Sequence, residues 1–357
     1  MKNKILLIFI VASMMFALVA CSSSPAYVDT AIPSEKSTGK IYLYGESHGV
    51  EKVLEKELEL WSKHYHEENM RHLFIELPYY TAEFLNIWMQ ADSDDILDEI
   101  YEEWKGTASY KDCVKDFYKK IKKECPETVF HGTDVGHQYH TTGQRFLKYL
   151  EENNLKDTEK YILAKEAIEQ GKYFYQNNDN IYRENKMAEN FIREFDKLQD
   201  ENIMGIYGSV HTDFNAMDFY SKSVPCMANQ LKKRYGDAVY SEDISWLEKM
   251  IEPIRVDIIT INGKDYEATY FGKQDLNGFK DYAYREYWRL ENAYDDFKYN
   301  KKTGNVLPYD NYIMQIEKGQ VFVIDYTKLD GSVNREYHRS DGRIWNGSPV
   351  TEEFIVE

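Results

Sequence analysis

The chain is poor in cysteine and has no CxxC pair. Its four cysteines are Cys21, Cys113, Cys125 and Cys226. If residues 110–124 form one helix, Cys113 and Cys125 lie about 18 Å apart along it, which is too far for a disulfide bond. We therefore predict no disulfide framework, and we interpret the three cysteines that follow Cys21 as buried thiols.

Positive charge is also scarce. The chain has 44 lysine and arginine residues against 61 aspartate and glutamate residues, which gives a formal net charge of −17 over 357 residues. So acidic a protein is poorly suited to binding nucleic acid or to lying flat on anionic lipid, because both surfaces repel it. We expect no nucleic-acid partner. The length is sufficient for one large domain and a smaller one.

The N-terminal segment is the exception to this polar composition. Lys2 and Lys4 precede an almost wholly apolar run, 5–20, and Leu-Val-Ala then leads to Cys21. A positive start, a short apolar run and small residues at the cleavage point are typical of a secretory signal, and the run is too short for a comfortable membrane span. Leu-x-Ala-Cys resembles the lipobox of bacterial lipoproteins, which implies that residues 1–20 are removed and that Cys21 carries a lipid. We therefore expect a protein anchored to the cell membrane on its extracytoplasmic face; an uncleaved anchor is the alternative.

Beyond the signal, the pattern predicts three regions. Residues 21–38 are rich in Ser, Thr and Pro and are expected to be a flexible tether. Residues 39–250 alternate short apolar runs with long amphipathic segments, which favours an α/β domain with a mainly parallel sheet flanked by helices. The expected strands are 41–44, 72–75, 129–130, 203–207 and 238–240. The expected helices are 51–70, 80–104, 109–124, 142–152, 157–174 and 181–200.

The C-terminal region, 251–357, has a different texture. A β-branched run, 256–261, leads into Asn262-Gly263, a strong two-residue hairpin signal. Residues 277–294 are expected to be helical, and 305–357 to form antiparallel strands, because turn signals punctuate them. We predict a β-rich appendage to the α/β domain.

Polar side chains follow four of the expected strands. In an open parallel sheet, ligands bind at the carboxyl ends of the strands. Taken singly, each residue is explained as a structural histidine, a helix cap or an ion-pair partner. Their convergence on one edge predicts a functional site, which glycines at 45, 49 and 208 support by allowing close approach of the backbone. The residues are Glu46, His48, Glu76, Asp134 and His211.

A helical segment contributes a further candidate. Arg183, Lys186, Met187 and Asn190 share one face if this segment is a helix. Such a mixed face suits a helix whose Arg183 points into the site, where it would pair with a carboxylate or hold an anion. The alternative is a solvated helix with ordinary Arg–Glu pairs.

The remaining candidates are given structural roles. His131, His137 and His140 do not follow a zinc-binding spacing. His64 and His66 fall on an amphipathic helix and are expected at the surface. Ser47 and Ser209 neighbour the site histidines, but neither lies in a Gly-x-Ser-x-Gly elbow, so a serine-hydrolase triad is not expected.

Four motifs together resemble the erythromycin esterase, ChaN and Tiki superfamily: Gly45-Glu46-Ser47-His48-Gly49, Glu76, Arg183-Glu-x-x-Met187-Ala188-x-Asn190 and Gly208-x-x-His211. The resemblance covers about residues 40–215 and implies an α/β fold with these Glu and His residues at the sheet edge. It implies a histidine general base without metal if the chain is like the esterases. It implies a metal-dependent protease if the chain is like Tiki, and haem binding if it is like ChaN.

This chain departs from the esterase pattern in two respects. The esterases carry Gly-Glu-x-x-His-Gly, whereas here one residue fewer separates Glu46 from His48. The large helical substrate lobe of macrolide esterases has no counterpart, so macrolides are not the expected substrate.

The leading hypothesis is a hydrolase of a small-molecule or peptide ester, lactone or amide. His48 would take a proton from water, and Glu46 or Glu76 would orient it. His211 would protonate the leaving group or hold the second proton, and Arg183 would stabilise the oxyanion. The runner-up is a lipoprotein that binds haem or a divalent metal through His48, Glu76 and His211. A catalytically inactive interaction module is the third hypothesis.

Overall fold

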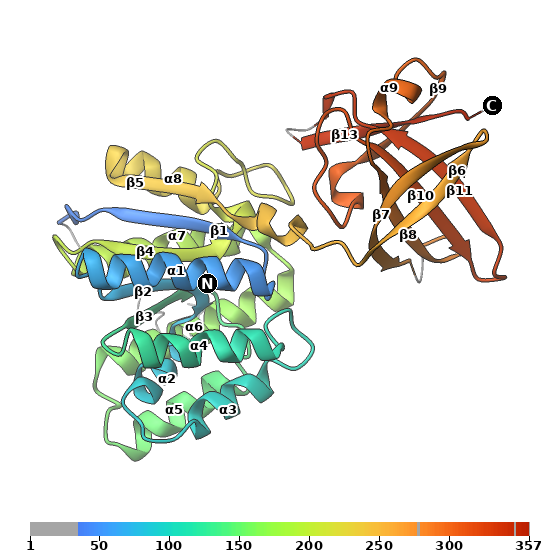
Figure 1. Ribbon diagram of the computed structural model, residues 1–357. Helices are drawn as coiled ribbons and strands as arrows, with labels where there is room; N and C mark the ends of the chain where they lie inside the picture. Colours follow the sequence, from blue (N-terminus) through green and yellow to red (C-terminus); the bar gives the residue numbers. More distant parts are fainter. Residues whose placement is uncertain (1–34, 277–278, 346–347, 357) are drawn as a thin grey trace, which may run out of the picture.

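A computed structural model of the protein describes residues 35–276, 279–345 and 348–356 (Figure 1). The predicted signal peptide, Cys21 and most of the predicted tether lie outside the described residues. At the start of the described chain, Ser37 is buried and its backbone N–H donates a hydrogen bond of 2.9 Å to Asp196 Oδ1. Within these ranges, none of the helices has both the length and the apolar character needed to cross a membrane.

The first half of the described chain forms a parallel sheet of five strands in the order β3-β2-β4-β1-β5. The predicted strands are confirmed, and each reaches further towards its carboxyl end than the sequence indicated. They are β1 (Ile41–Glu46), β2 (His72–Pro78), β3 (Val129–Asp134), β4 (Ile203–Gly208) and β5 (Val239–Asp243).

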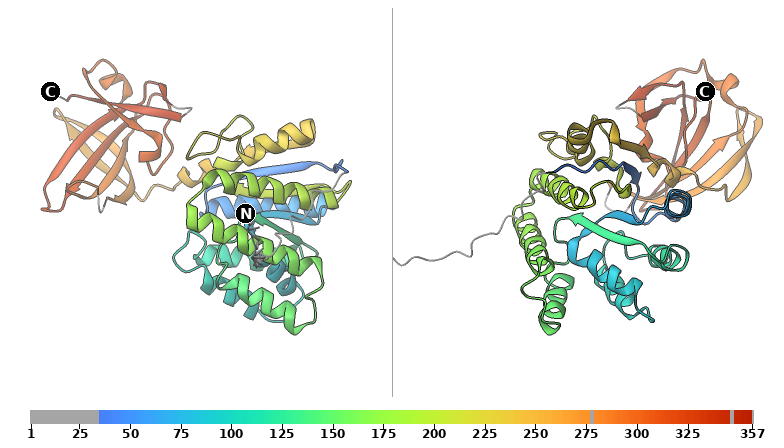
Figure 2. Two further views of the ribbon diagram at one scale, coloured as in Figure 1. Left: turned by 180° about the vertical axis from the view of Figure 1, so that it is seen from behind. Right: turned by 90° about the vertical axis from the view of Figure 1, so that its left-hand side faces the viewer.

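Helices lie on both sides of this sheet (Figure 2). They are α1 (Glu51–Glu67), α2 (Tyr79–Met89), α3 (Asp95–Glu103), α4 (Asp112–Glu124), α5 (Thr142–Glu152), α6 (Glu159–Asn177), α7 (Asn180–Lys197) and α8 (Met227–Tyr235). The single helix expected over 80–104 is wrong, because α2 and α3 are separate. Asp and Ser side chains between them favour turns over helix, and Asp94 there accepts a hydrogen bond from Trp88 Nε1 at 3.0 Å.

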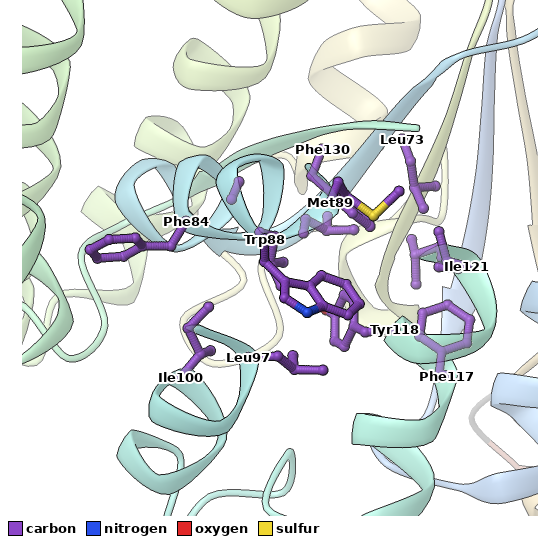
Figure 3. Packing of buried hydrophobic residues seen from close by; sticks show 14 of the residues in the cluster. Leu73, Phe84, Trp88, Met89, Leu97, Ile100, Phe117, Tyr118, Ile121 and Phe130 are labelled. Carbon is purple, nitrogen blue, oxygen red and sulfur yellow. The ribbon is translucent and has the colours of Figure 1, made fainter. Parts of the chain in front are cut away.

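Each strand sends alternate side chains to opposite faces, and this splits the core in two. On one face, Ile41 and Leu43 pack with side chains of α7 and α8. On the other face, Tyr44 and Leu73 pack with side chains from α1 to α6. Figure 3 shows part of this second cluster, with Trp88 at its centre. The helices therefore leave the strand ends, rather than the sheet faces, open for a site.

The C-terminal part forms an antiparallel sheet, as predicted. The expected helix over 277–294 is wrong, because its described residues include strand β8. Tyr and Trp residues are concentrated there, and aromatic residues favour strands. The elements are β6 (Arg255–Ile261), β7 (Lys264–Asp275), β8 (Tyr282–Leu290), α9 (Tyr294–Phe297), β9 (Lys302–Pro308), β10 (Val321–Lys328), β11 (Val333–Arg339), β12 (Ile344–Trp345) and β13 (Ser348–Phe354).

Two smaller predictions have mixed outcomes. The Asn262-Gly263 hairpin is confirmed: the pair joins β6 to β7 with φ of 52° and 78°, as a type I′ turn requires. The cysteines of the described residues are free, and Cys125 and Cys226 are buried. Cys113 is partly exposed, so its interpretation as a buried thiol is wrong.

Candidate functional site

The structure brings the predicted site residues together at the carboxyl edge of the parallel sheet. Glu46 ends β1 and His48 follows it, while Glu76 lies near the end of β2. Asp134 ends β3. His211 closes the short 3-10 turn η1 (Ser209–His211) that follows β4. Adjacent strands thus deliver these side chains to one place, as the parallel topology predicts.

Glu46 and His48 form a carboxyl–imidazole pair. His48 Nδ1 lies 2.8 Å from Glu46 Oε1, so one residue fewer than in the esterase motif still allows this contact. The turn that permits it depends on Gly49, whose φ of +66° favours glycine. With Nδ1 engaged, His48 Nε2 lies 3.8 Å from Glu76 Oε2, and the His48 side chain remains 42% exposed.

Glu76 is the centre of the cluster. Its Oε2 accepts a hydrogen bond of 2.6 Å from the Gly208 N–H, and its Oε1 accepts one of 2.6 Å from Arg183 Nη2. His211 Nε2 lies 3.6 Å from the same Oε1. A Cβ at position 208 would lie 3.1 Å from His48 Nε2, so this close approach favours glycine. Glu76 therefore faces both histidines and the arginine.

Arg183 links Glu76 to Asp134. Its Nε and Nη2 donate to the two Asp134 oxygens at 3.0 and 2.6 Å, a bidentate arrangement. The prediction that Arg183 points into the site is confirmed, since it lines the same cavity as His48. Its strongest contacts are with these two carboxylates. Its expected role towards an oxyanion stays a prediction.

His211 is oriented from behind by a residue that sequence reasoning missed. Its Nδ1 lies 2.7 Å from Glu184 Oε2, and Glu184 Oε1 accepts a hydrogen bond of 2.5 Å from the Met227 N–H. Both side chains are buried. Glu184 directly follows Arg183 in the helical motif, and this Arg-Glu pair was the available signal. Arg183 contacts Glu76 directly, whereas Glu184 contacts His211, which faces Glu76.

The pKa values show how strongly these groups interact. Burial alone would lower the pKa of His48, but its hydrogen bond to Glu46 and the charges of Glu76 and Glu46 raise it to about 9. Burial would raise the pKa of Glu76, but His211, His48 and Arg183 lower it to about 2. The pKa of His211 is raised despite burial, chiefly by Glu76 and Glu184. At neutral pH, His48 is therefore mainly protonated, and the surroundings of His211 favour its protonated form.

A cavity of about 330 Å³ opens onto this cluster. Its polar lining includes Glu46, His48, Glu76, Asp134 and Arg183. Its apolar lining comes from helix and strand residues: Leu54, Ile75, Leu77, Trp104, Val114, Phe117 and Ile206. His211 is not among the lining residues and lies behind Glu76. Of the predicted site residues, those that line the cavity are thus Glu46, His48, Glu76, Asp134 and Arg183.

Other sequence candidates have varied positions. Lys186 pairs with Glu189, Met187 is in the core and Asn190 donates to the Thr133 carbonyl, so of that helical face only Arg183 contacts the carboxylates of the site. His137 lines the cavity and lies 2.8 Å from Asp134 Oδ2. His64 is buried against the Tyr44 hydroxyl, so its expected surface position is wrong. The hydroxyl gives this buried ring a polar partner, which the helix pattern could not indicate.

The donor set does not fit a metal ion well. Both histidines have a carboxyl group on Nδ1 and face Glu76 with Nε2, which is how metal-binding histidines are oriented. Glu76, however, already accepts hydrogen bonds from Arg183 and Gly208, and a cation beside it would be repelled by the guanidinium. Among the described residues, no group of three or more His, Cys, Asp or Glu side chains is arranged to hold a metal ion.

The tyrosines of the cavity are not ionised to the phenolate form that ligates haem iron. Tyr118 and Tyr175 line the cavity. Burial raises the pKa of both, and the acidic residues near each raise it further, so both phenols stay protonated at neutral pH. The residues at this edge therefore favour acid–base chemistry over ligation.

No protein-family model and no curated protein matches the sequence. Among solved structures, a mutant of the erythromycin esterase EreC in its open conformation has 10% identity and a TM-score of 0.44, covering 70% of this chain and 82% of its own. A Bacillus cereus protein has 13% identity and a TM-score of 0.44, covering 90% and 86%. ChaN of Campylobacter jejuni with cofacial haem has 11% identity and a TM-score of 0.30, covering 61% and 83%.

These neighbours include an erythromycin esterase and a ChaN, two of the groups that the sequence motifs resemble. At identities of 10–13% and TM-scores below 0.5, these matches do not establish a family for this chain. Activity, substrate and ligand do not follow from them.

Proposed function

We propose that this protein is a hydrolase of ester, lactone or amide bonds in which His48 activates water. The observation that carries the proposal is the carboxyl–imidazole pair of Glu46 and His48 at the cavity, with Nδ1 at 2.8 Å from the Glu46 oxygen and Nε2 at 3.8 Å from Glu76 Oε2, beyond hydrogen-bond distance. An imidazole held in this way is oriented and made more basic by its carboxyl partner, as in other hydrolytic sites.

In the proposed reaction, neutral His48 takes a proton from water through Nε2 while the water oxygen attacks the substrate carbonyl. The resulting imidazolium then gives this proton to the leaving group, so one histidine serves as base and acid. Arg183, which lines the cavity, stabilises the oxyanion electrostatically. Of the two roles expected for His211, its position behind Glu76 favours holding a proton there and keeping Glu76 ionised.

The cavity lining suggests the shape of the substrate. Trp104, Val114 and Phe117 give the cavity an apolar lining from α4 and the turn after α3, whereas Arg183 comes from α7 and Asp134 from β3. A substrate with an apolar group next to its ester, lactone or amide would bury that group there. Neutral or apolar small molecules fit better than anions, because the protein as a whole is acidic.

The test is a screen of chromogenic esters, lactones and amides with apolar acyl groups. General acid–base catalysis by one residue contributes about 10²–10⁴-fold, so His48→Ala should lower kcat/KM by about that factor. The thermal midpoint should change little, because His48 is 42% exposed. His66→Ala is the matched control, since His66 is an exposed histidine on α1. An active His48→Ala protein would refute the proposal.

We also propose that the protein is a lipoprotein anchored through Cys21 on the extracytoplasmic face of the membrane. The support is the sequence alone: a charged start, a short apolar run and Leu-x-Ala-Cys. Mass spectrometry of the native protein should find an N-terminal peptide that begins at a lipidated Cys21. Cys21→Ala should abolish the lipid, whereas Cys113→Ala should not. A peptide that begins at Met1, or at Ser22 without lipid, would contradict the anchor.

A further inference from the structure

Glu57 is a buried carboxyl group that the reaction proposed above leaves unused. It lies on α1 and has no exposed surface. Neither of its oxygens has a hydrogen-bond donor among the described residues. A bare carboxylate in such a place is strongly unfavourable, and proteins avoid it by pairing or neutralising the group.

The position of Glu57 on α1 indicates that the carboxyl group is not needed for stability. Val53, Leu54 and Trp61 are buried on the same face of α1, at three or four residues from Glu57. This is the apolar stripe by which α1 packs on the sheet. A leucine at position 57 would continue that stripe, so the carboxyl group needs another explanation.

The surroundings of Glu57 are the candidate site. Glu57 lines the same cavity as Glu46, His48 and Glu76, together with Tyr118 from α4. Burial raises the pKa of Glu57 well above its usual value, and the neighbouring Glu46 carboxylate raises it further. Arg183, the cation of this cavity, is bound to Glu76 and Asp134 instead.

If Glu57 and Glu46 are both ionised, neither carries a hydrogen that it could donate to the other. This explains why both Glu57 oxygens lack a donor. If Glu57 carries a proton, its contact with Glu46 becomes an O–H···O hydrogen bond, which is stronger when the acceptor is charged. Glu46 is the acceptor in this bond, because its Oε1 already faces protonated His48 at 2.8 Å.

We propose that Glu57 is a positioning residue that stays neutral and donates its carboxyl hydrogen to Glu46, fixing Glu46 on Nδ1 of His48. The catalytic benefit of this positioning rests on the proposed function. The chain of contacts Glu57–Glu46–His48 itself can be tested without a substrate. Residues that hold an active group in this way typically change activity by about 10–100-fold when removed.

The first test is infrared difference spectroscopy of the full-length protein between wild type and Glu57→Gln at pH 7 to 8. The wild type should show the carbonyl band of a protonated carboxylic acid, and this band should be lost in Glu57→Gln. Its absence from the wild type at pH 7 would overturn the proposal, because Glu57 would then be ionised.

The second test compares Glu57→Gln, which keeps a donor, with Glu57→Leu, which does not. Proton NMR should show a low-field signal from His48 Nδ1–H, identified by its loss in His48→Ala. The signal should persist in Glu57→Gln and should broaden away in Glu57→Leu, because a loosened Glu46 exposes this proton to exchange. An equal signal in both variants would overturn the positioning role.

Thermal melting separates this role from a structural one. Glu57→Leu should melt at a higher temperature than the wild type, because it completes an apolar stripe, whereas a structural carboxyl would make it melt lower. With p-nitrophenyl acetate as the probe, kcat/KM should fall by about 10–100-fold in Glu57→Leu and less than about threefold in Glu57→Gln. If the wild type hydrolyses no ester, the proposed function fails, and the infrared and NMR results still decide the role of Glu57.

Discussion

Two largely buried arginines, Arg183 in the α/β part and Arg285 in the C-terminal β part, are satisfied in different ways. Arg183 in the α/β part bridges the carboxylates of Glu76 and Asp134, which are 7% and 0% exposed. Arg285 in the β part is also buried, and its guanidinium donates to uncharged side chains, those of Gln274, Asn311 and Tyr326. A buried arginine can thus be satisfied without concentrating carboxylates around it.

Several ion pairs of the β part lie at the surface, although Arg339, which is buried, faces Asp341 there. Lys264 and Asp296 are 59% and 40% exposed, and Arg255 and Asp257 are 49% and 33% exposed. Such pairs contribute about 0–1 kcal/mol each. The sheet edge differs in gathering two carboxylates and two histidines around one arginine, which is the pattern expected of a site that does chemistry.

Breaking the buried cluster should have the largest effect on stability. Glu76→Gln leaves Arg183 and His211 without their shared carboxylate and should lower the free energy of unfolding by about 3–5 kcal/mol. Asp296→Asn in the exposed pair of the β part is the matched control and should cost at most about 1 kcal/mol. Urea unfolding of both variants measures the difference. Equal losses of unfolding free energy in the two variants would mean that the buried cluster contributes no more to stability than the exposed pair.

The second-largest effect is expected from acid, which should destabilise the α/β part through its buried carboxylates. The pKa of Glu76 is lowered to about 2, so the stability that it contributes is present above its usual value near 4.5 and is lost as the pH falls from there towards 2. Asp134, with a pKa lowered mainly by Arg183 against the effect of burial, acts in the same direction. Thermal melts between pH 6 and 2 should therefore fall steeply for wild type and less steeply for Glu76→Gln. Parallel curves would contradict the lowered pKa.

The smallest effect is expected in the β part, at its hairpin. Gly263 has a φ of +78°, so Gly263→Ala should cost about 1 kcal/mol, because a Cβ disfavours the left-handed region. Asn262→Gly in the same turn should change stability less, since glycine accepts this conformation. Ester hydrolysis should be unaffected by both, which thermal melts and an activity assay would check. A loss of activity would tie the hairpin to the site.

The sequence predicted the parallel sheet well because its strands are short apolar runs that end in glycine or polar residues. It also predicted which side chains meet, since parallel strands carry Glu46, Glu76 and Asp134 to the same edge. It failed for β8, where Tyr, Trp and Arg fit both a helix and a strand until the neighbouring strands are known.

The partners of the site residues were less accessible to sequence reasoning. Glu184 contacts His211 from α7, and Glu57 approaches Glu46 from α1, so both depend on how helices pack against the strand ends. Glu57 lies in the apolar stripe of α1, and the sequence pattern alone gives no reason to assign a function to a single Glu there. His64 was misplaced for the same reason, since its partner Tyr44 comes from a strand.

The central claim is that His48 is the base of a hydrolytic site, and the pH dependence of ester hydrolysis tests it most directly. Because the pKa of His48 is raised to about 9, only about one molecule in a hundred has neutral His48 at pH 7. The account predicts that kcat/KM, corrected for the uncatalysed reaction, rises about tenfold per pH unit from pH 6 to 8 and levels off near pH 9. His48→Ala should lack this rise. A rate that levels off near pH 6.5, or the same profile in His48→Ala, would contradict the claim.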